Sequence, residues 1–415
     1  MKLLIVTRET SSDRSYGLGK TLSPVLEQLE SRGHSVTYYD KSATDHLHRK
    51  WQPVFERYLG FFLKGLTPAI AERLIQGISA AAKALGEGYS HVWLHDPWLA
   101  LGLYIGLLRK GRIRRPFKLI ISEHGLGSFA WAVTLDGLPI QSAAFRRLVR
   151  LERQLLQRAD AVFVPSYVAR DALLRDLGLT DVPGNLHVMG YGRPRLELPT
   201  RHAARRYFDL PLDDLAATDV SGSVPLPASP PVILASGRIA PVKAFPLLID
   251  VIARLQQQHG LAAQLIIAGG GDSTALQHQA EALQLEYPPI IGFQEDMGWS
   301  LAAADLYIST CPVESYGQAN REAIAAGLPV IAPASGGSGE VLGQGAHLLP
   351  VCDLSAETDA VARARIVNTL AAELADTLSN PDHYRYWQAK ARREAGLWPD
   401  WSDLADIYEA RLTGL

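Results

Sequence analysis

The amino-acid sequence predicts an α/β protein with two doubly wound domains, each built on a parallel β-sheet. Short apolar runs rich in β-branched residues alternate with helical periodicity through almost the whole chain. This series occurs twice, once in each half of the sequence. The length agrees with both observations, because 415 residues suffice for two or three domains of about 150 residues.

The first half contains strand-like runs separated by helical segments. A first buried strand is expected over 2–7 (KLLIVT), and a helix follows from about Gly19 to Arg32. Because short strands joined through helices need crossover connections, these strands should run parallel. The remaining runs of this half are HSVTYY (34–39), HVWLH (91–95), KLIIS (118–122) and AVFVPS (161–166).

The second half repeats the pattern with PVILASG (231–237), QLIIAGG (264–270), ADLYIST (304–310) and LPVIAP (328–333). Residues 221–231 (SGSVPLPASPP) form the strongest linker signal in the chain, because proline and serine dominate them. They are either the seam between the domains or a surface loop of the second domain. In the latter case the seam lies near Gly192 to Pro199.

Composition excludes several classes of protein. The chain has 41 Lys and Arg against 43 Asp and Glu, so its net charge is −2. It therefore lacks the overall positive electrostatic field that non-specific binding of nucleic acid needs. Cys311 and Cys352 are the two cysteines; they form no disulfide framework and suggest a reducing compartment. The apolar run after the start is only Leu3 to Val6, so we expect no signal peptide. The longest uncharged stretch, 97–108, is too short to span a bilayer, so we expect a cytoplasmic protein.

The most informative segment covers 311–340 (CPVESYGQANREAIAAGLPVIAPASGGSGE). Gly317 allows a tight turn before a helix that starts near Gln318 and ends at Gly327. The start of a helix offers free N–H groups to an anion, and a carboxylate such as Glu322 can accept hydrogen bonds from a vicinal diol. Phosphate and diol together describe a nucleotide. Glu314 and Glu322 could equally be solvated carboxylates of an ordinary surface helix.

Two cations follow the first strand of the second half. Arg238 comes directly after Gly237 at the end of that strand, and Lys243 lies at the expected start of the next helix. Ligands of open α/β sheets collect at the carboxyl ends of the strands, where two cations can hold a diphosphate. Solvated surface charges are the alternative interpretation of both residues.

Two further segments follow strands of the first half. Gly17 and Gly19 suggest a turn that lets a ligand approach the backbone, but no phosphate-binding Walker loop, since Arg14 stands where its first glycine belongs. Leu22 likewise excludes a G-x-G-x-x-G dinucleotide fingerprint. His124, in EHGLG (123–127), follows the strand KLIIS and can exchange hydrogen bonds near neutral pH. A lone histidine is also often structural.

Taken together, these segments resemble the family-4 glycosyltransferases, which are retaining enzymes of the GT-B architecture with two Rossmann-like domains facing a cleft. The resemblance runs over nearly the whole chain. It rests on Gly17–Gly19, Arg32–His34, the His124 segment, 151–166 (LERQLLQRADAVFVPS), 237–243 (GRIAPVK), 267–272 (IAGGGD), the Glu314/Glu322 block and 333–340 (PASGGSGE).

The resemblance implies a role for each matching position. Arg238 and Lys243 would bind the diphosphate of a nucleotide sugar, Glu314 would lie by the donor sugar, and Glu322 would bind the ribose diol. His124 would contact the donor sugar near the reacting centre. The catalytic set is then His124, Arg238, Lys243 and Glu314, and the donor-binding set adds Gly17, Gly19, Gly237, Gly270, Phe293 in the base-side stretch 290–296, Gly317, Gln318, Ala319 and Glu322.

The resemblance also implies a domain plan and a mechanism. Residues 1–198 would bind the acceptor and 199–395 the nucleotide sugar, with the last helix, about 396–415, packing back on the first domain. The donor would be a substrate, and no cofactor and no metal are expected, since protein cations replace a divalent ion. A sugar would pass to a hydroxyl of a saccharide, a lipid-linked molecule or a small metabolite. A sugar-nucleotide epimerase and a non-catalytic sugar-nucleotide-binding module are the alternatives.

The sequence departs from the family pattern at three places. Ala244 follows Lys243 where the family usually has glycine, and 187–195 (HVMGYGRPR) replaces the usual segment before the crossing between domains. Asn320 and Arg321 precede Glu322 where small or apolar residues are commoner.

Two segments of the first half suggest contact with a membrane. Residues 51–66 carry an apolar and aromatic stripe at helical spacing, and 109–118 (RKGRIRRPFK) is strongly basic. An amphipathic helix and a basic cluster are typical of proteins that meet anionic lipid, which would place the protein at the inner face of the membrane. The alternative is a stripe that packs on the sheet and a solvated loop.

Overall fold

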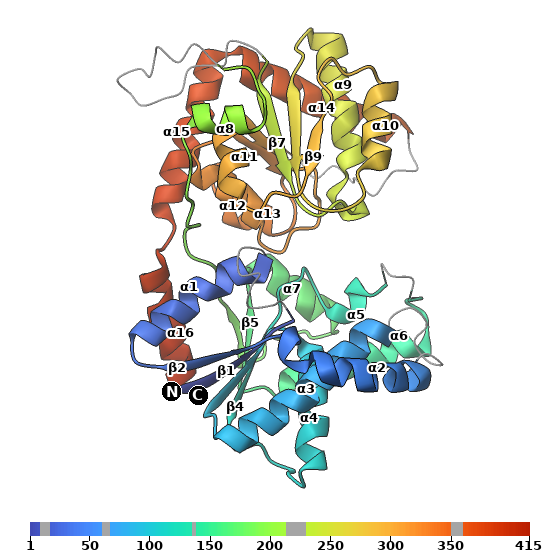
Figure 1. Cartoon of the computed structure of the whole chain (residues 1–415), viewed down its shortest axis with the longest axis vertical. Helices are drawn as coiled ribbons and strands as arrows, with labels where there is room; N and C mark the ends of the chain where they lie inside the picture. Colours follow the sequence, from blue (N-terminus) through green and yellow to red (C-terminus); the bar gives the residue numbers. More distant parts are fainter. Residues whose placement is uncertain (9–16, 60–66, 135–137, 213–229, 350–359) are drawn as a thin grey trace. The chain divides into compact units, whose positions relative to one another are not determined.

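The computed structural model describes residues 1–8, 17–59, 67–134, 138–212, 230–349 and 360–415. They form two compact units (Figure 1). Unit 1 is Met1–Gly192 together with Pro399–Leu415, and unit 2 is Arg193–Trp398. Cys352, most of the proline-rich segment 221–231 and the end of the stripe 51–66 lie outside the described residues.

Unit 1 is built on a six-stranded parallel sheet of order β2-β1-β3-β4-β5-β6. Five strands lie where the sequence predicts them. β3 and β5 are buried throughout, and β1 and β4 are buried except at their first residues. The strands are β1 (Lys2–Val6), β2 (Ser35–Tyr39), β3 (His91–Leu94), β4 (Lys118–Ser122), β5 (Ala161–Val164) and β6 (Leu186–Val188).

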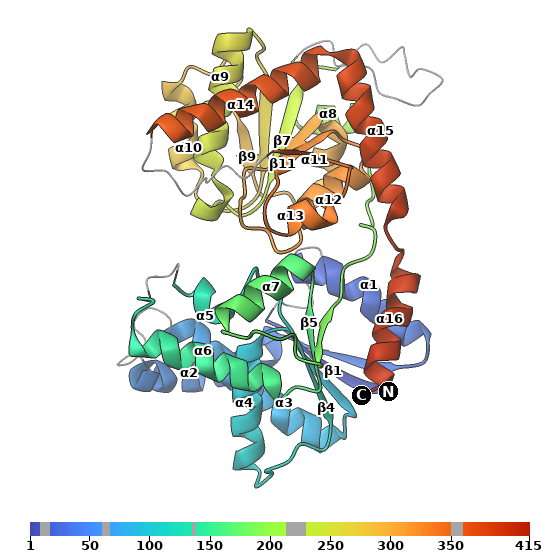
Figure 2. The same cartoon turned by 180° about the vertical axis from the view of Figure 1, so that it is seen from behind.

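Helices cover both faces of this sheet (Figures 1 and 2). α3 and α4 pack with backbones in contact, since a Cβ at Gly77 would overlap the Leu99 carbonyl oxygen. α4 is the uncharged stretch of the sequence and is a buried core helix, capped by Asp96. The helices are α1 (Gly17–Ser31), η2 (Lys41–Thr44), α2 (Asp45–Leu59), α3 (Thr67–Glu87), α4 (Pro97–Arg109), α5 (Phe129–Ala132), α6 (Ala143–Gln157), α7 (Tyr167–Asp176) and α16 (Trp401–Thr413).

Unit 2 repeats the design with a parallel sheet of order β12-β11-β10-β7-β8-β9. Its strands are β7 (Val232–Ser236), β8 (Gln264–Ala268), β9 (Ile290–Gly292), β10 (Leu306–Ile308), β11 (Val330–Pro333) and β12 (His347–Leu349). Its helices are α8 (Arg201–Tyr207), η3 (Pro241–Lys243), α9 (Phe245–His259), α10 (Thr274–Ala282), α11 (Met297–Ala303), α12 (Gln318–Ala325), α13 (Gly336–Val341), α14 (Ala360–Ser379) and α15 (Pro381–Leu397). Two doubly wound parallel sheets confirm the predicted fold class.

A buried ion cluster joins α8 to the sheet of unit 2. The Asp305 carboxylate is fully buried and forms ion pairs with Arg201 and, at 2.8 Å, with Arg205. It also accepts the Val232 N–H at 2.7 Å, so the first residue of β7 is tied to the start of β10. Because a buried charge without partners is very costly, these residues act as one structural group.

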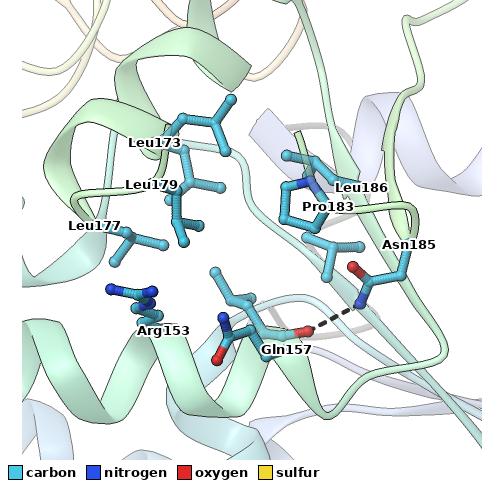
Figure 3. A pocket seen from close by; sticks show the side chains of 11 residues that line it. Arg153, Gln157, Leu173, Leu177, Leu179, Pro183, Asn185 and Leu186 are labelled. Atoms are coloured by element: carbon cyan, nitrogen blue, oxygen red, sulfur yellow. Dashed lines mark hydrogen bonds between the residues drawn. The ribbon is translucent and has the colours of Figure 1, made fainter. Parts of the chain in front are cut away.

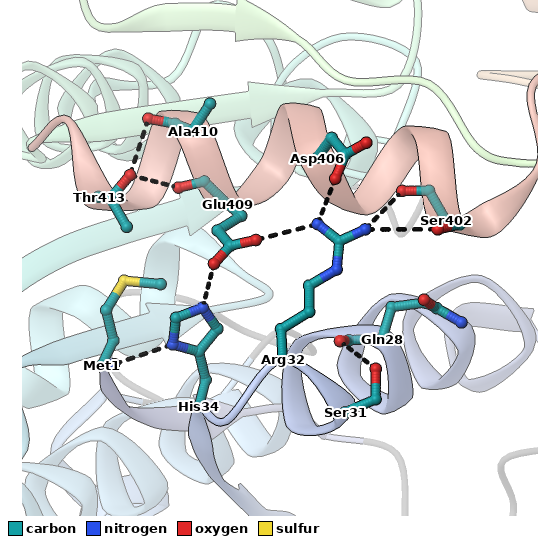
Figure 4. A network of polar contacts seen from close by, with 10 residues as sticks. All are labelled: Met1, Gln28, Ser31, Arg32, His34, Ser402, Asp406, Glu409, Ala410 and Thr413. Carbon is teal, nitrogen blue, oxygen red and sulfur yellow. Dashed lines mark hydrogen bonds and ion pairs between the residues drawn. The ribbon is translucent and has the colours of Figure 1, made fainter.

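The last helix, α16, packs on unit 1 through an apolar face and a polar rim (Figure 4). Trp401, Tyr408 and Leu412 are buried in the same cluster as Leu29 of α1. At the rim, Glu409 accepts hydrogen bonds from Arg32 at 2.9 Å and contacts His34 Nε2 at 2.6 Å. The segment Arg32-Gly33-His34 of the family resemblance thus contacts the C-terminal helix.

A small recess in unit 1 lies among α6, α7 and the segment before β6 (Figure 3). Leucines form most of its wall, and Asn185 Nδ2 donates to the Leu156 carbonyl at 3.0 Å. It lies where β6 begins, whereas the predicted site residues follow the ends of strands. We therefore attribute this recess to packing.

Candidate active site

The predicted donor residues of unit 2 lie at the switch point of its sheet. The chain runs from β7 through β8 to β9 on one side, and then returns to place β10 on the other side of β7. Leu306 of β10 lies opposite Ile233 of β7, so the loops that follow these strands leave the sheet together. Open α/β sheets bind ligands at this point. Arg238 and Lys243 come from the first loop, and Glu314 comes from the second.

Lys243 and Glu314 form an ion pair in which Nζ and Oε1 are 2.5 Å apart. Their side chains are 23% and 21% exposed, so the pair is sheltered but reachable. Burial acts to lower the pKa of Lys243, but the Glu314 carboxylate outweighs it, and the pKa is raised overall. Thr310 Oγ1 donates to the Lys243 carbonyl at 2.7 Å and fixes the backbone below the pair. Lys243 is therefore a held cation at neutral pH.

Cys311 lies beside this pair. Its thiol is buried and in the reduced form, and burial together with the Glu314 charge raises its pKa to about 11. A thiol with so high a pKa is a poor nucleophile at neutral pH. Cys311 therefore packs against the pair instead of supplying a reactive sulfur.

Ala244 is one of the departures from the family pattern, and its backbone conformation is unusual for alanine. It has a φ of 51°, in the left-handed region, between η3 and α9. Glycine enters this region without strain, whereas another L-residue costs about 1–2 kcal/mol. The loop keeps the conformation that suits glycine although alanine occupies the position.

The loop that carries Glu314 rests on a pair of glycines. The Gly337 N–H donates to the Glu314 carbonyl at 2.6 Å, and a Cβ at Gly336 would overlap the same oxygen. Gly317 caps α12 with a φ of 72°, and a Cβ there would lie 2.9 Å from Ser338 Oγ. No side chain caps this helix, so its first N–H groups, at Gln318 and Ala319, have no partner within the helix.

Glu322 lies in α12 and is only 8% exposed. Burial first raises the pKa of Tyr307, and the charges of Glu314 and Glu322 add to this against the opposing bond from Ser236. Tyr307 Oη is 3.0 Å from Ser236 Oγ at the end of β7. Both glutamate charges therefore act on a phenol that is bonded to the end of β7.

The other donor residues of unit 2 line the neighbouring loops. Arg238 is exposed, and Gly237 has a φ of 136° with its N–H bonded to the Ala268 carbonyl at 3.1 Å. The Gly270 carbonyl accepts the Ile239 N–H at 2.9 Å, which joins the loops after β7 and β8. Phe293 is 59% exposed, and its ring is the nearest group to a Cβ built at Gly270.

In unit 1, His124 follows β4 and is held at both ring nitrogens. His95 Nδ1 lies 3.0 Å from its Nε2, and the Tyr191 hydroxyl lies 2.9 Å from its Nδ1. Burial lowers the pKa of His124 to about 4, so the ring is neutral at physiological pH. Gly17 and Gly19 lie in the first turn of α1, and residues 9–16 before them are outside the described residues.

Several residues around His124 were not predicted as site residues. His95 ends the strand-like run HVWLH, and Tyr191 belongs to the departing segment 187–195. Glu123 and Glu152 are buried close to one another, and the Glu152 carboxylate accepts the N–H groups of Phe129 and Ala130 at 2.8 and 2.9 Å. His95, Glu123 and Tyr191 follow strands, which is the signal that could have drawn attention to them, whereas Glu152 lies within α6.

The segments proposed for membrane contact have different environments. In α2, Trp51, Val54 and Tyr58 are exposed, whereas Phe55 packs against the core. Leu108, in the last turn of α4, is 64% exposed, and Ile113, in the loop after α4, is 89% exposed, with exposed basic residues between them. Among the residues described, no helix is both long and apolar enough to cross a membrane.

Two protein families match the two halves of the chain. Residues 16–192 match "Glycosyl transferase 4-like domain", and residues 218–394 match "Glycosyl transferases group 1". The boundary between the matches falls in the stretch that follows Gly192, the last residue of the first part of unit 1.

Known proteins of the same kind align with the chain. D-inositol 3-phosphate glycosyltransferase from Nocardioides sp. is 30% identical over 370 residues, which are 79% of this chain and 72% of that protein. Mannosylfructose-phosphate synthase from Agrobacterium fabrum is 25% identical over 217 residues, 49% of this chain and 44% of that protein. The chain thus spans less than half the length of this second relative.

A solved structure has the same fold over the whole chain. Anabaena Alr3699/HepE, in complex with UDP and glucose, superposes with a TM-score of 0.64 at 18% identity and covers 100% of both chains. Its likeness concerns the fold. With both family matches and the 30% identical relative, this chain belongs to the glycosyltransferases of the GT-B, family-4 type.

Proposed function

We propose that this glycosyltransferase moves a sugar, with retention of its anomeric configuration, from a nucleoside-diphosphate sugar to a hydroxyl of a saccharide, lipid-linked or small-molecule acceptor. The observation that carries the proposal is the Lys243–Glu314 pair at the switch point of unit 2, beside the N-terminus of α12 and the buried Glu322. A diphosphate needs cations and N–H groups, and a ribose needs a carboxylate for its diol. These groups gather on one sheet edge.

The chemistry follows from where charge develops. As the glycosidic bond breaks, negative charge grows on the leaving diphosphate, and Arg238 and Lys243 neutralise it. The acceptor hydroxyl attacks the same face of the anomeric carbon from which the diphosphate leaves. Its proton passes to that diphosphate, which is the base at hand. We propose that these protein cations take the place of a divalent metal and that no cofactor takes part.

The nature of the donor rests on the family and on the solved relative. The Anabaena protein carries UDP and glucose in its structure, which supports a nucleoside-diphosphate hexose as the donor here. The names of the two curated relatives contain a phosphorylated cyclitol and a phosphorylated disaccharide. An acceptor of sugar or cyclitol type agrees with both names.

The experiment that tests the proposal mixes the purified chain with UDP-, GDP- and ADP-hexoses and a panel of hydroxyl acceptors. Product anomers are read from proton NMR couplings. We expect an acceptor-dependent product with the donor's anomeric configuration and full activity in EDTA. Conversion of the donor to an epimer without acceptor supports the epimerase, and tight donor binding without turnover supports the non-catalytic module.

A lipid surface as a partner rests on a different observation. The last turn of α4 exposes Leu108 and the loop that follows exposes Ile113, both among basic residues, which suits an anionic bilayer. This loop precedes β4, whereas His124 follows β4, so the loop and His124 lie at opposite ends of that strand. Co-sedimentation with anionic vesicles at low and physiological salt tests the contact, with Ile113→Ser as the variant. Absence of binding at low salt excludes this partner and leaves a soluble acceptor.

A further inference from the structure

Unit 1 has a pocket of its own at the carboxyl edge of its sheet. His95, Asp96, Glu123 and His124 line it, together with the segment that leads into α5. Leu94 of β3 lies opposite Ile121 of β4, so the residues that follow these neighbouring strands come together. The chain reverses its direction of strand addition between β1 and β3, so the pocket borders the switch point where such sheets bind ligands.

Two buried polar atoms belong to residues that line this pocket. His95 Nε2 and Glu123 Oε1 have no hydrogen-bond partner among the residues that the structure describes, and their side chains are over nine-tenths buried. Buried polar atoms in native proteins are nearly always bonded, and each exception needs an explanation. Two exceptions on the wall of one pocket indicate that a ligand completes them.

The bonding of His124 decides what His95 offers. Suppose that His124 Nε2 carries the proton and donates a hydrogen bond to His95 Nδ1. His95 would then hold its own proton on Nε2, which would be a buried N–H without an acceptor. An orphaned N–H is rarer than an acceptor that lacks a donor. The favoured arrangement therefore has His95 donating from Nδ1, with His124 donating to the Tyr191 hydroxyl. His95 Nε2 is then a lone pair that can accept a ligand's hydrogen.

Glu123 offers the complementary group. Its carboxyl is buried beside Glu152 and Asp96, and burial first, and then these charges, raise its pKa well above the ordinary value, against the opposing effect of Arg73. In its protonated form this carboxyl is neutral and has one O–H to donate, for which the neighbouring Glu152 is a competing acceptor. A hydroxyl can thus donate to His95 and accept from Glu123.

The charge of the wall selects among ligands. The side chains that line the pocket, within the described residues, include no lysine and no arginine. The nearby guanidinium of Arg73 is engaged with Asp96, at 2.5 Å from Nε to Oδ2, and lies over the Phe129 ring. A phosphate would therefore meet a carboxylate and two neutral groups with no cation to balance it, which is costly.

We propose that His95 and Glu123 form a hydrogen-bonding subsite for an uncharged hydroxyl of the acceptor, so that the enzyme takes a neutral sugar or cyclitol in preference to its phosphate monoester. This inference rests on the proposed function and names its substrate class. His95 and Glu123 then contact substrate, whereas Tyr191 positions the ring of His124.

The first test uses the unaltered chain. The donor is the nucleoside-diphosphate hexose that the enzyme turns over. The acceptors are four neutral compounds, each compared with its monophosphate: D-glucose, D-fructose, D-mannose and myo-inositol. We expect kcat/KM for the neutral acceptor to exceed that for its phosphate by at least about tenfold, since one unpaired buried charge costs that much. A preference for the phosphate overturns the inference and leaves the proposed function standing. No transfer to any acceptor overturns both.

The second test uses Glu123→Met and His95→Phe, which keeps an aromatic ring but removes the acceptor Nε2 together with the Nδ1 that contacts His124. Each should lower kcat/KM for the neutral acceptor by about 10- to 100-fold through the acceptor KM, with the donor KM unchanged. The matched control is His91→Phe at the other end of β3, whose Nε2 lies 3.0 Å from the Leu412 carbonyl. Activity should survive in the control. Circular dichroism checks that both pocket variants are folded. An unchanged acceptor KM in two folded variants contradicts the subsite.

Discussion

At the scale of single residues, Lys243 is the side chain whose removal should reveal the chemistry. Lys243→Ala deletes a cation held 2.5 Å from Glu314, and Arg238→Ala deletes its exposed neighbour. In the proposed mechanism both cations act on charge that grows in the transition state, so each variant should lower kcat by about 10²–10³ with a smaller change in donor KM. Steady-state kinetics with varied donor measures this.

Treatment with EDTA is the control for this prediction. If a chelator abolishes activity while Lys243→Ala and Arg238→Ala retain it, then a metal neutralises the diphosphate and the assignment of both residues is wrong. Lys390→Ala, at a half-buried position of α15 where Nζ donates to Gln344 Oε1 at 3.0 Å, should leave all constants unchanged.

Glu322 should behave in the opposite way, since it is expected to contact the ribose both before and during the reaction. Glu322→Ala should raise donor KM and weaken binding by roughly 1.5–3 kcal/mol per charged hydrogen bond lost. Turnover at saturating donor should change less. Isothermal titration with UDP and GDP, alongside kinetics, separates these effects, and an unaltered donor KM contradicts the ribose assignment.

Sequence pattern alone points to these candidate residues of unit 2 but not to the partners of His124. Arg238, Lys243, Glu314 and Glu322 lie in loops next to recognisable strands and glycines, so local pattern locates them. His95 meets His124 only because β3 and β4 pair in register, and Tyr191 reaches the same ring from 67 residues further along the chain. Sequence spacing carries no information on such contacts.

At the scale of elements, edge strands limit what a pattern reveals. The strands β6, β9 and β12 are three residues long and lie at sheet edges, and most of their residues are half-buried. They lack the buried apolar run that marks β4 or β8, so the sequence analysis assigned no strand there. The interior strands are buried on both faces, and all of them were predicted.

The short helix α5 gives a prediction on pH, because Glu152 binds its first N–H groups. Burial first, with Asp96 and Asp176 adding to it, raises the pKa of Glu152 to about 7, against the two backbone bonds. The folded chain therefore keeps a proton that the unfolded chain loses near pH 4.5. Stability should be fully present below pH 4.5 and fall by on the order of 3 kcal/mol as pH rises to 7.

Urea unfolding of unit 1 at pH 5, 6 and 7 measures this slope. Glu152→Gln cannot ionise and should reduce the slope, while Glu123, whose pKa is also raised, keeps a remainder. The variant is less stable overall because an amide offers one acceptor oxygen. Glu30→Gln, at an exposed position of α1, should keep the slope of the original chain. An equal slope in the original chain and in Glu152→Gln would show that another group binds the proton.

The attachment of α16 tests whether its apolar face or its polar rim dominates. Leu412 is fully buried, so Leu412→Ala should cost about 2–5 kcal/mol. Glu409 is 29% exposed and binds Arg32, which is 21% exposed, so Glu409→Ala should cost about 1 kcal/mol or less. Urea titration compares the two. If Glu409→Ala destabilises as much as Leu412→Ala, the ion pairs and not the apolar contacts hold this helix.

At the scale of the whole molecule, two units with separate cores should unfold separately, and nucleotide should stabilise one of them. Each unit has its own apolar clusters: Leu4 and Leu119 lie in one of unit 1, and Ile233 and Ile267 in one of unit 2. We expect two calorimetric transitions. Leu412→Ala should lower the transition of unit 1. Asp305→Asn, which removes the buried partner of Arg205, should lower the transition of unit 2.

These variants assign the transitions, and UDP or GDP then locates the donor site. A nucleotide at a hundred times its Kd stabilises the state that binds it by about 2.7 kcal/mol, or roughly 5–10 °C for a unit of this size. Only the transition assigned to unit 2 should rise, and Lys243→Ala should reduce the rise, because the nucleotide contacts proposed here belong to the loops after β7 and β10 and to α12. A rise in temperature confined to the transition of unit 1 would place the nucleotide near His124. A single transition that both variants and the ligand shift together would mean that the two units fold as one.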